Sequence, residues 1–495
     1  MKSEDIIPET LEDREIIINK ELNIWEALIP IIVLVCLLAY NIFIYGDNAL
    51  TGSNQFILLM GAAVAAIVGF RNKVTYAQMM EEVSQNIKST SEAILILLMV
   101  GALAGTWLIS GIIPTMIYYG LELLSPKFFL TASIIICSLV SLATGSSWST
   151  SATVGIALIG IGNTMGIAPG MTAGAVLSGA YFGDKISPLS DTTNLAPAMA
   201  GSKLFEHIQY MLITTIPSLT IAILFFIIAG LYLPGQGVAD VHDKLNAIST
   251  SFNVSAWLFI VPLVVIFMII KKTSPLIALM TGAILGGIAA IIAQPDVVVQ
   301  VAGGNVLDFN TAYKGIINAL TTSVNVHTSN EELSDLFSSG GMGGMLQTIW
   351  LILSAMVFGG VMEAIGALSI ISKALLKMFH SVFGLFTSTV MSCIFMNTTA
   401  SDQYLAIVIP GKMYKKAYED RGLHPVNLSR TLEDSGTVTS VLVPWNTCGA
   451  YNSGVLGVAT GEYFMYAIFN WVSPIITLIV AGLGYKIRKI NPKTA

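Results

Sequence analysis

The chain has 495 residues, of which 54% are hydrophobic and 11% charged, and its net charge is −6. A soluble domain carries about 25% charged residues, and a soluble fold of this length cannot bury so much apolar surface. The composition therefore excludes a soluble enzyme, a nucleic-acid binder and a disordered scaffold. It indicates a polytopic membrane protein surrounded by lipid.

We predict that residues 1–23 form a polar cytoplasmic tail, because the first 21 residues hold seven acidic and three basic side chains. This polarity is unlike that of a signal peptide or a transit peptide. The cysteines show no CxxC spacing, so they predict neither a zinc site nor a disulfide framework. The four cysteines are Cys36, Cys137, Cys393 and Cys448.

Eight stretches are long and apolar enough to cross a bilayer as helices, which takes about 20 residues. They are 24–45, 54–70, 91–111, 208–232, 255–271, 275–293, 346–367 and 463–486. Three further apolar stretches, 127–182, 384–411 and 425–457, are interrupted by polar residues. Because irregular backbone at membrane depth is tolerated only inside protein or beside a wet cavity, we expect broken helices or re-entrant hairpins there.

Basic residues gather in particular short loops, which the positive-inside rule places in the cytoplasm. These residues are Arg71, Lys73, Lys88, Lys271, Lys272, Lys373, Lys377, Lys412, Lys415, Lys416, Arg421, Lys486, Arg488 and Lys489. The loops 46–53, 233–254 and 294–345 hold only two basic residues, so we expect them outside. Both termini, including the tail 488–495, are then cytoplasmic, and a bacterial inner membrane is the expected location.

The sequence contains an internal repeat at an offset of 255 residues. The polar run that begins at Thr144 falls on the run that begins at Thr399, and Asp191 falls on Asn446. The charge map gives the two copies opposite directions through the membrane. We therefore predict an all-α fold of two inverted repeats, 24–232 and 255–487, joined by the external linker 233–254. Inverted repeats whose broken helices meet near the midplane are typical of secondary transporters.

The densest polar stretch, GDKISPLSDTTN at 183–194, is the predicted ion site of the first repeat. Pro188 removes one backbone donor and opens the helix, which frees carbonyl groups as cation ligands. The carboxylates of Asp184 and Asp191 bracket this break. Because an unpaired charge is costly at membrane depth, each carboxylate must be paired, protonated or bound to a cation. We expect Na⁺ at Asp191 and the neighbouring oxygens, in competition with H⁺.

Other oxygen-bearing side chains in the breaks are candidate ion or proton ligands, although a hydroxyl on a helix often bonds back to a carbonyl instead. They are Thr144, Ser146, Ser147, Ser187, Thr192, Asn397, Thr399, Asp402, Asn446 and Thr447. Glu363 lies in an otherwise apolar span and is either a proton relay or the partner of a lysine. Lys185 is read as a counter-ion. Glu433 and Asp434 follow Arg430 at ion-pair spacing, so they are read first as structural.

The runs GDKISPLSDTTNLAPAMAG (183–201) and LFEHIQYMLITTIPS (204–218) resemble the signature of the NhaC family of Na⁺/H⁺ antiporters. TGSSWST (144–150) and FGGVMEAIGAL (358–368) also fit that family, and the similarity runs over about 24–487. The resemblance implies a scaffold domain, a mobile transport domain, elevator-like alternating access and a homodimer. Some relatives in this family exchange malate for Na⁺-lactate with protons, and the motif does not separate these substrates.

The leading hypothesis is a Na⁺/H⁺ antiporter that needs no cofactor besides the transported ions. The alternative is an organic-acid exchanger of the malate/lactate type, which needs a cationic anchor such as Lys185 or Arg430. A channel is disfavoured by the paired broken helices. An enzyme is disfavoured because the chain has no HExxH or GxSxG motif, and the absence of a P-loop excludes ATP as the energy source.

Overall fold

The structure is a computed structural model that describes residues 16–45, 52–232, 238–328, 334, 337–378 and 381–490. The outer parts of the predicted tails, 1–15 and 491–495, lie outside the described residues, as do 46–51 and 233–237 of the predicted external loops. Within the described ranges, eight helices are long and apolar enough to cross a membrane. A ninth span is counted when a pair of helices, bent by 83°, is taken as one. The prediction of an all-α polytopic membrane protein is confirmed.

The first repeat is a run of helices with two breaks. They are α2 (Ile24–Tyr45), α3 (Ser53–Arg71), α4 (Tyr76–Ile109), α5 (Ile112–Leu123), α6 (Pro126–Thr144), α7 (Ser147–Thr150), π-helix η3 (Ser151–Gly155), α8 (Ile156–Thr164), α9 (Pro169–Ile186), α10 (Asp191–Ala200) and α11 (Leu204–Tyr232). The breaks fall between α6 and α7 and between α9 and α10, inside the polar stretches that the sequence marks.

The region that connects the two predicted repeats, and the start of the second one, contain helices and two short strands. The elements are α12 (Val238–Ser251), η4 (Ala256–Phe259), α13 (Ile260–Ile270), α14 (Pro275–Ala293), α15 (Pro295–Ala302), α16 (Phe309–Thr321), β1 (Val324–Asn325), β2 (Ser338–Ser339) and α18 (Gly341–Gly344). The two strands pair antiparallel, with Val324 opposite Ser339. Asp308 caps α16 by accepting a hydrogen bond from the backbone N–H of Thr311 at 2.7 Å.

The remaining elements belong to the predicted second repeat. They are α19 (Leu346–Ala364), α20 (Ala367–Met378), α21 (Val382–Thr399), α22 (Leu405–Glu419), α23 (Val426–Leu432), π-helix η5 (Glu433–Thr437), η6 (Ser440–Leu442), α24 (Thr447–Leu456), α25 (Thr460–Tyr463) and α26 (Ile468–Gly482). Where the sequence predicts one span over 463–486, the structure has α25 and α26 with a short interruption.

Helix boundaries in the two repeats agree at the offset of 255 residues. Helices α4, α5 and α6 end at 109, 123 and 144, and α19, α20 and α21 end at 364, 378 and 399. Gly111 and Gly366 occupy matching turns and share a φ of 77°, a left-handed conformation that glycine adopts without strain. Several helix ends and one glycine turn therefore recur at the offset of the predicted repeat. The opposite direction of its two copies stays a prediction.

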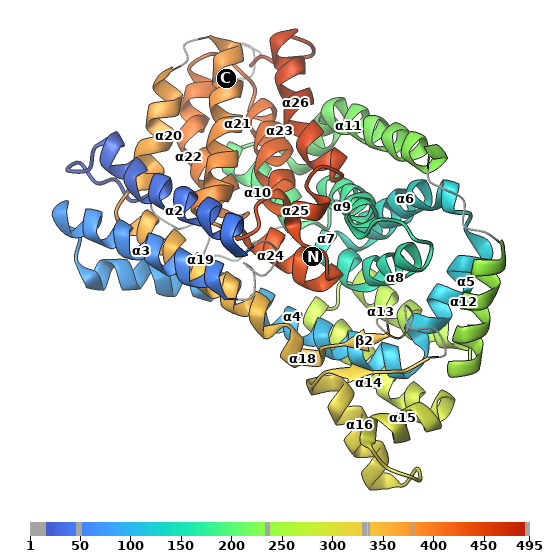
Figure 1. The fold of residues 1–495 in the computed structure, drawn as a ribbon. Coiled ribbons are helices and arrows are strands. Elements are labelled where there is room, and N and C mark those ends of the chain that lie inside the picture. Colours follow the sequence, from blue (N-terminus) through green and yellow to red (C-terminus); the bar gives the residue numbers. More distant parts are fainter. Residues whose placement is uncertain are drawn as a thin grey trace.

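The helices pack into two neighbouring groups (Figure 1). In one group, α4 packs against α14 and α19, and α3 packs against α2 and α19. In the other group, α6 lies along α9, α11 contacts α6 and α26, and α21 to α23 contact one another. Both pairs of breaks lie in this second group, so the candidate site lies among helices from both repeats.

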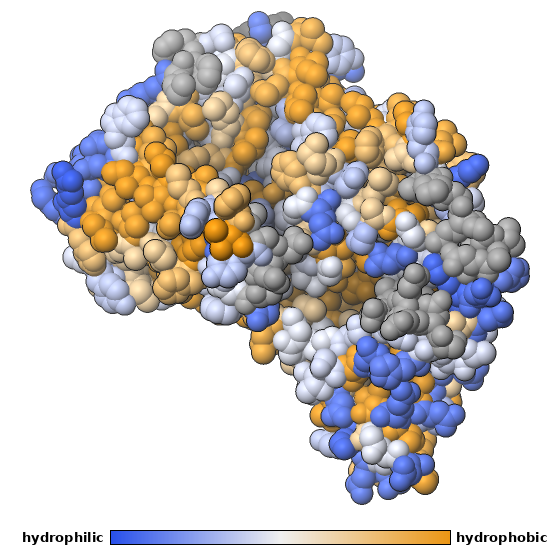
Figure 2. Space-filling model, viewed as in Figure 1, coloured by the Kyte–Doolittle hydropathy of each residue, from blue (hydrophilic) through white to orange (hydrophobic). Residues whose placement is uncertain are grey.

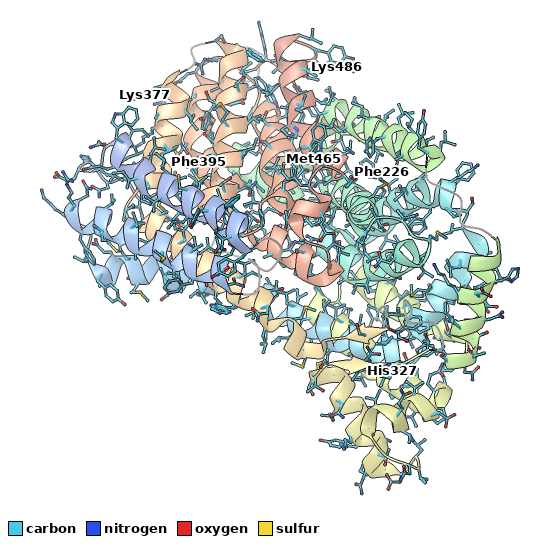
Figure 3. All side chains as sticks on the ribbon, viewed as in Figure 1. Phe226, His327, Lys377, Phe395, Met465 and Lys486 are labelled. Atoms are coloured by element: carbon cyan, nitrogen blue, oxygen red, sulfur yellow. The ribbon has the colours of Figure 1, made fainter. Side chains whose placement is uncertain are left out.

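The surface is apolar along much of the helix sides, and hydrophilic side chains gather toward the ends of the molecule, including the tip near α15 and α16 (Figure 2). Lys377 and Lys486 lie at one end of the view and His327 at the other (Figure 3). The predicted basic loops that contain these lysines therefore share one end. Helices α15 and α16 lie toward the opposite end of the view (Figure 1).

Candidate functional site

The first break ends α6 and aims the start of α7 into the protein. Gly145 has a φ of 72° and receives the last turn of α6, since its N–H donates to the carbonyl of Ser141 at 2.7 Å. Ser146 then caps α7, accepting a hydrogen bond from the N–H of Ser149 at 3.1 Å. The chain thus begins a new helix inside the protein, and the first N–H groups of a helix are available to an anion.

Asp184 occupies that position. Its Oδ2 accepts hydrogen bonds from the backbone N–H of Ser147 at 3.1 Å and from the hydroxyl of Ser147 at 2.6 Å. Asp184 is 7% exposed, and the side chain of Ser190 lies beside it. Carboxylates held by hydroxyl and backbone groups are favourable ligands for hard cations, and the partial positive charge of a helix N-terminus also stabilises the anion.

The second break separates α9 from α10, and side-chain hydroxyls around it donate hydrogen bonds to backbone carbonyls. Ser187 donates to the carbonyl of Leu142 at 2.9 Å, which ties this break to α6. Thr193 donates to the carbonyls of Asp184 and Lys185 at 3.1 and 2.9 Å, at the end of α9. The Ser187 hydroxyl, a predicted ligand candidate, thus connects the second break to the end of α6.

Asp191 differs from Asp184 in its surroundings. It is the first residue of α10, its side chain is exposed, and the side chain of Tyr404 lies beside it. Thr192, the next residue, is buried and faces the second repeat. The sequence places both carboxylates at one break, and the structure separates them into an exposed carboxylate and a buried one.

Hydrogen bonds from side-chain and backbone amide groups connect the two breaks of the second repeat. Asn446 caps α24, accepting from the N–H of Cys448 at 3.0 Å, and its Nδ2 donates to the carbonyl of Asn397 at 3.0 Å. Asp402 accepts from the N–H of Leu405 at 3.0 Å, at the start of α22. The N–H of Thr447 donates to the carbonyl of Ser401 at 2.9 Å. These contacts bring the two second-repeat breaks together.

Two of the predicted hydroxyl ligands bond within their own helices. Thr399 donates to the carbonyl of Phe395 at 2.8 Å, and Thr144 donates to the carbonyl of Ser141 at 3.4 Å. Back-bonding of this kind is common for hydroxyls on helices. Their hydroxyl hydrogens are thus used within the helix ends, close to the breaks.

Two contacts cross between the repeats beside Asp184. Lys185 forms an ion pair with Asp434, and both side chains are fully buried. The hydroxyl of Thr192 donates to Glu433 Oε1 at 2.9 Å. The reading of Glu433 and Asp434 as partners of Arg430 is right only for Asp434, whose Oδ2 lies 3.9 Å from Arg430 Nε. The chain continues as a π-helix from Glu433, which turns that side chain toward α10 instead.

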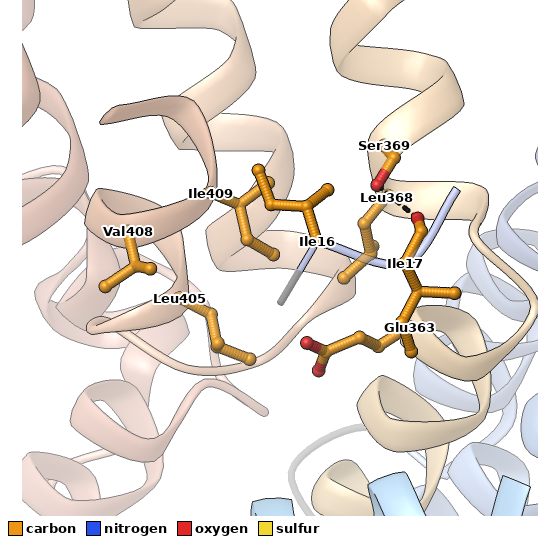
Figure 4. Close-up of a pocket in the computed structure, with 8 residues that line it drawn as sticks. All are labelled: Ile16, Ile17, Glu363, Leu368, Ser369, Leu405, Val408 and Ile409. Atoms are coloured by element: carbon orange, nitrogen blue, oxygen red, sulfur yellow. Dashed lines mark hydrogen bonds between the residues drawn. The ribbon is translucent and has the colours of Figure 1, made fainter. Parts of the chain in front are cut away.

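Glu363 lies apart from Asp184, in a pocket between α19, α20 and α22 (Figure 4). The residues that line the pocket are Ile16, Ile17, Glu363, Leu368, Ser369, Leu405, Val408 and Ile409. Ser369 donates to the carbonyl of Ile17 at 2.7 Å, so the end of the N-terminal tail is fixed beside Glu363.

The chain is similar to transporters over most of its length. The model of the Na⁺/H⁺ antiporter family matches residues 179–485. A protein of Haemophilus influenzae, named as an uncharacterized Na⁺/H⁺ antiporter, is 36% identical over 94% of this chain and 97% of its own length. The Na⁺/H⁺ antiporter NhaC of Alkalihalophilus pseudofirmus is 34% identical, over 87% and 90%. The malate-2H⁺/Na⁺-lactate antiporter of Bacillus subtilis is 35% identical, over 87% and 89%.

Proposed function

We infer that the chain, which belongs to the Na⁺/H⁺ antiporter family, is a secondary transporter that exchanges Na⁺ for H⁺ across a membrane. The observation that carries the assignment of the site is Asp184, a buried carboxylate held by Ser147 at the break between α6 and α7. We propose that Na⁺ and H⁺ bind this carboxylate in turn, because an ionised group buried in a membrane protein needs either a proton or a cation.

Asp191 supplies the exposed carboxylate of the same site. It lies at the N-terminus of α10, seven residues after Asp184, beside Tyr404 of the second repeat. We propose that Na⁺ meets Asp191 first and reaches Asp184 from there, with hydroxyl and carbonyl oxygens of the breaks completing its coordination. Oxygen ligands of these kinds suit a hard monovalent cation.

The packing of the helices into two groups supports a transport domain that moves against a scaffold. The breaks and both carboxylates belong to the group around α6, α9, α10 and α21 to α23, whereas α3, α4, α14 and α19 form the neighbouring group. We propose that the first group moves against the second in an elevator-like cycle and exposes Asp191 to each side in turn. The shared end of Lys377 and Lys486 is proposed to face the cytoplasm.

The test is transport by purified protein in proteoliposomes with a pH-sensitive dye inside. An inward Na⁺ gradient is expected to make the lumen more alkaline in wild type, because protons leave as Na⁺ enters. Asp184→Asn is expected to abolish this signal. A signal of wild-type size in that variant would remove Asp184 from the ion site.

Organic-acid exchange is the second candidate function, and the observation that favours it is Arg430. This side chain is fully buried, and its Cζ lies 4.5 and 6.0 Å from the ring centroids of Tyr210 and Phe386. None of its three guanidinium nitrogens has a hydrogen-bond partner within the described part of the chain. Lys185, the other predicted anchor, forms the closer ion pair with Asp434, whose Oδ2 lies 3.9 Å from Arg430 Nε. Malate or lactate added to the same proteoliposomes distinguishes the two functions.

A further inference from the structure

Residues 16–21, which we call the strap, precede α2 and lie against helices that are far from them in the sequence. One end of the strap is held at the loop between α3 and α4. There Asn19 Nδ2 donates to the carbonyl of Asn72 at 3.2 Å, and Glu21 forms an ion pair with Lys73 at 3.1 Å. The strap is therefore anchored on the group of helices that contains α3 and α19.

The strap then crosses the turn between α19 and α20. Gly366 forms this turn, and a Cβ at this position would lie 2.9 Å from the backbone nitrogen of Asn19. A side chain at position 366 would collide with the strap, so the glycine permits its close approach. Ser369 of α20 donates to the carbonyl of Ile17 at 2.7 Å. These contacts fix the backbone of the strap on the turn.

The other end of the strap reaches a helix of the second group. Ile16 and Ile17 lie in a pocket that three side chains of α22 also line, namely Leu405, Val408 and Ile409 (Figure 4). Helix α22 packs against α10, which carries the exposed carboxylate of the ion site, whereas α19 packs against α3 and α4. One short segment thus contacts both groups of helices.

We propose that the strap is a self-inhibitory contact that slows the exchange cycle by holding α22 to the turn between α19 and α20. In the elevator-like cycle, the group with α10 and α22 moves against the group with α3 and α19, and the strap lies across their boundary. The two isoleucines must leave the α22 side of the pocket during this motion, which exposes apolar surface. The inference rests on the proposed function and adds a regulatory contact to it.

The double variant Ile16→Ser with Ile17→Ser tests the strap in full-length protein in proteoliposomes. Serine loses the apolar contacts with α22, so the released strap becomes more populated, and Na⁺/H⁺ exchange is expected to be roughly three- to tenfold faster than in wild type. Ser369→Ala removes the hydrogen bond to Ile17 and is expected to give a smaller increase. Ile18→Ser is the matched control, because the Ile18 side chain is 54% exposed. It is expected to exchange at the wild-type rate.

An increase in rate is diagnostic, because a damaged protein loses transport instead. A rate at or below that of wild type overturns the strap if the double variant unfolds at the wild-type temperature. If the double variant unfolds at a lower temperature, Ser369→Ala decides, and a wild-type rate in that variant overturns the strap.

Glu363 lines the same pocket, so the rates are compared over a range of pH. Release of the strap is expected to raise the rate by the same factor at each pH. A shift in the pH of maximal rate would assign the effect to Glu363 and overturn the strap.

Hydrogen exchange of backbone amides tests the strap without transport. In the double variant, amides at the start of α22 are expected to exchange faster than in wild type, because a contact that restrains this segment is lost. Unchanged exchange there overturns the strap. Absence of Na⁺-driven proton movement in wild type would instead overturn the proposed function.

Discussion

Lys185 of α9 and Asp434 of η5 form an ion pair whose two side chains are fully buried. The residues are 249 positions apart, so the pair fastens the first repeat to the second. Ser473 accepts a hydrogen bond from Lys185 at 2.9 Å, and Thr477 donates to Asp434. Because Asp184 directly precedes Lys185 in the chain, the pair also connects the proposed ion-binding carboxylate to the second repeat.

Lys185→Met is expected to destabilise the protein by about 3–5 kcal/mol, because it leaves the buried Asp434 carboxylate with only the more distant Arg430 as a cationic partner. The measurement is unfolding of the purified protein in detergent. Lys73→Met is the control, since Lys73 pairs with Glu21 at 3.1 Å with side chains 75% and 58% exposed. An exposed pair contributes up to about 1 kcal/mol. Equal effects of the two substitutions would contradict the structural role of Lys185.

Ser147→Ala is expected to weaken Na⁺ binding about ten- to a hundredfold. The substitution removes the hydroxyl that lies 2.6 Å from Asp184, and hydrogen bonds to charged groups contribute about 1.5–3 kcal/mol. Calorimetric titration of purified protein with Na⁺ measures the change. Ser138→Ala is the control, because the Ser138 hydroxyl bonds to the carbonyl of Ile134 inside α6. Unchanged Na⁺ affinity in Ser147→Ala would show that Asp184 does not bind the ion.

The positions of the broken helices could be predicted from the sequence because their causes are local. Gly145 adopts a left-handed backbone at the end of α6, and Pro188 follows the end of α9. The repeat offset likewise anticipates helix ends that agree between the two copies. These features depend on residues close to one another in the chain, where composition and spacing carry the information.

The partners of the charged residues could not be predicted in the same way. Thr192 and Glu433 are 241 residues apart, and their contact depends on how two helices from different repeats pack. The α-helical spacing from Arg430 suggests a structural role for both Glu433 and Asp434. In the structure a π-helix begins at Glu433, and the two side chains contact different partners. The exposure of Asp191 depends in the same way on surrounding helices, which one sequence does not reveal.

Asp191→Asn is expected to abolish Na⁺-driven proton movement while the protein remains folded. Asp191 is exposed at the first position of α10, so removing its charge costs at most the helix-end interaction, about 0.3–1 kcal/mol. Dye-based transport and unfolding in detergent are measured on the same sample. Asp296→Asn, an exposed carboxylate in the first turn of α15, is the control and is expected to transport normally. Exchange at the wild-type rate in Asp191→Asn would make Asp191 structural.

Competition between Na⁺ and H⁺ predicts that the apparent Na⁺ affinity falls as the pH falls. If one proton must leave the site before Na⁺ binds, affinity falls about tenfold per pH unit on the acidic side, which equals about 1.4 kcal/mol. Transport is then expected to be bell-shaped in pH, because at low pH Na⁺ cannot bind and at high pH no proton loads for the return step. Calorimetric titrations with Na⁺ at a series of pH values measure the slope.

Asp184→Asn has no proton to displace from this position, so residual binding in that variant is expected to be weak and to lose most of its pH dependence. An affinity that is independent of pH in wild type would mean that Na⁺ and H⁺ do not share a site. Organic-acid exchange, with Arg430 as the anchor, would then become the better account of this transporter.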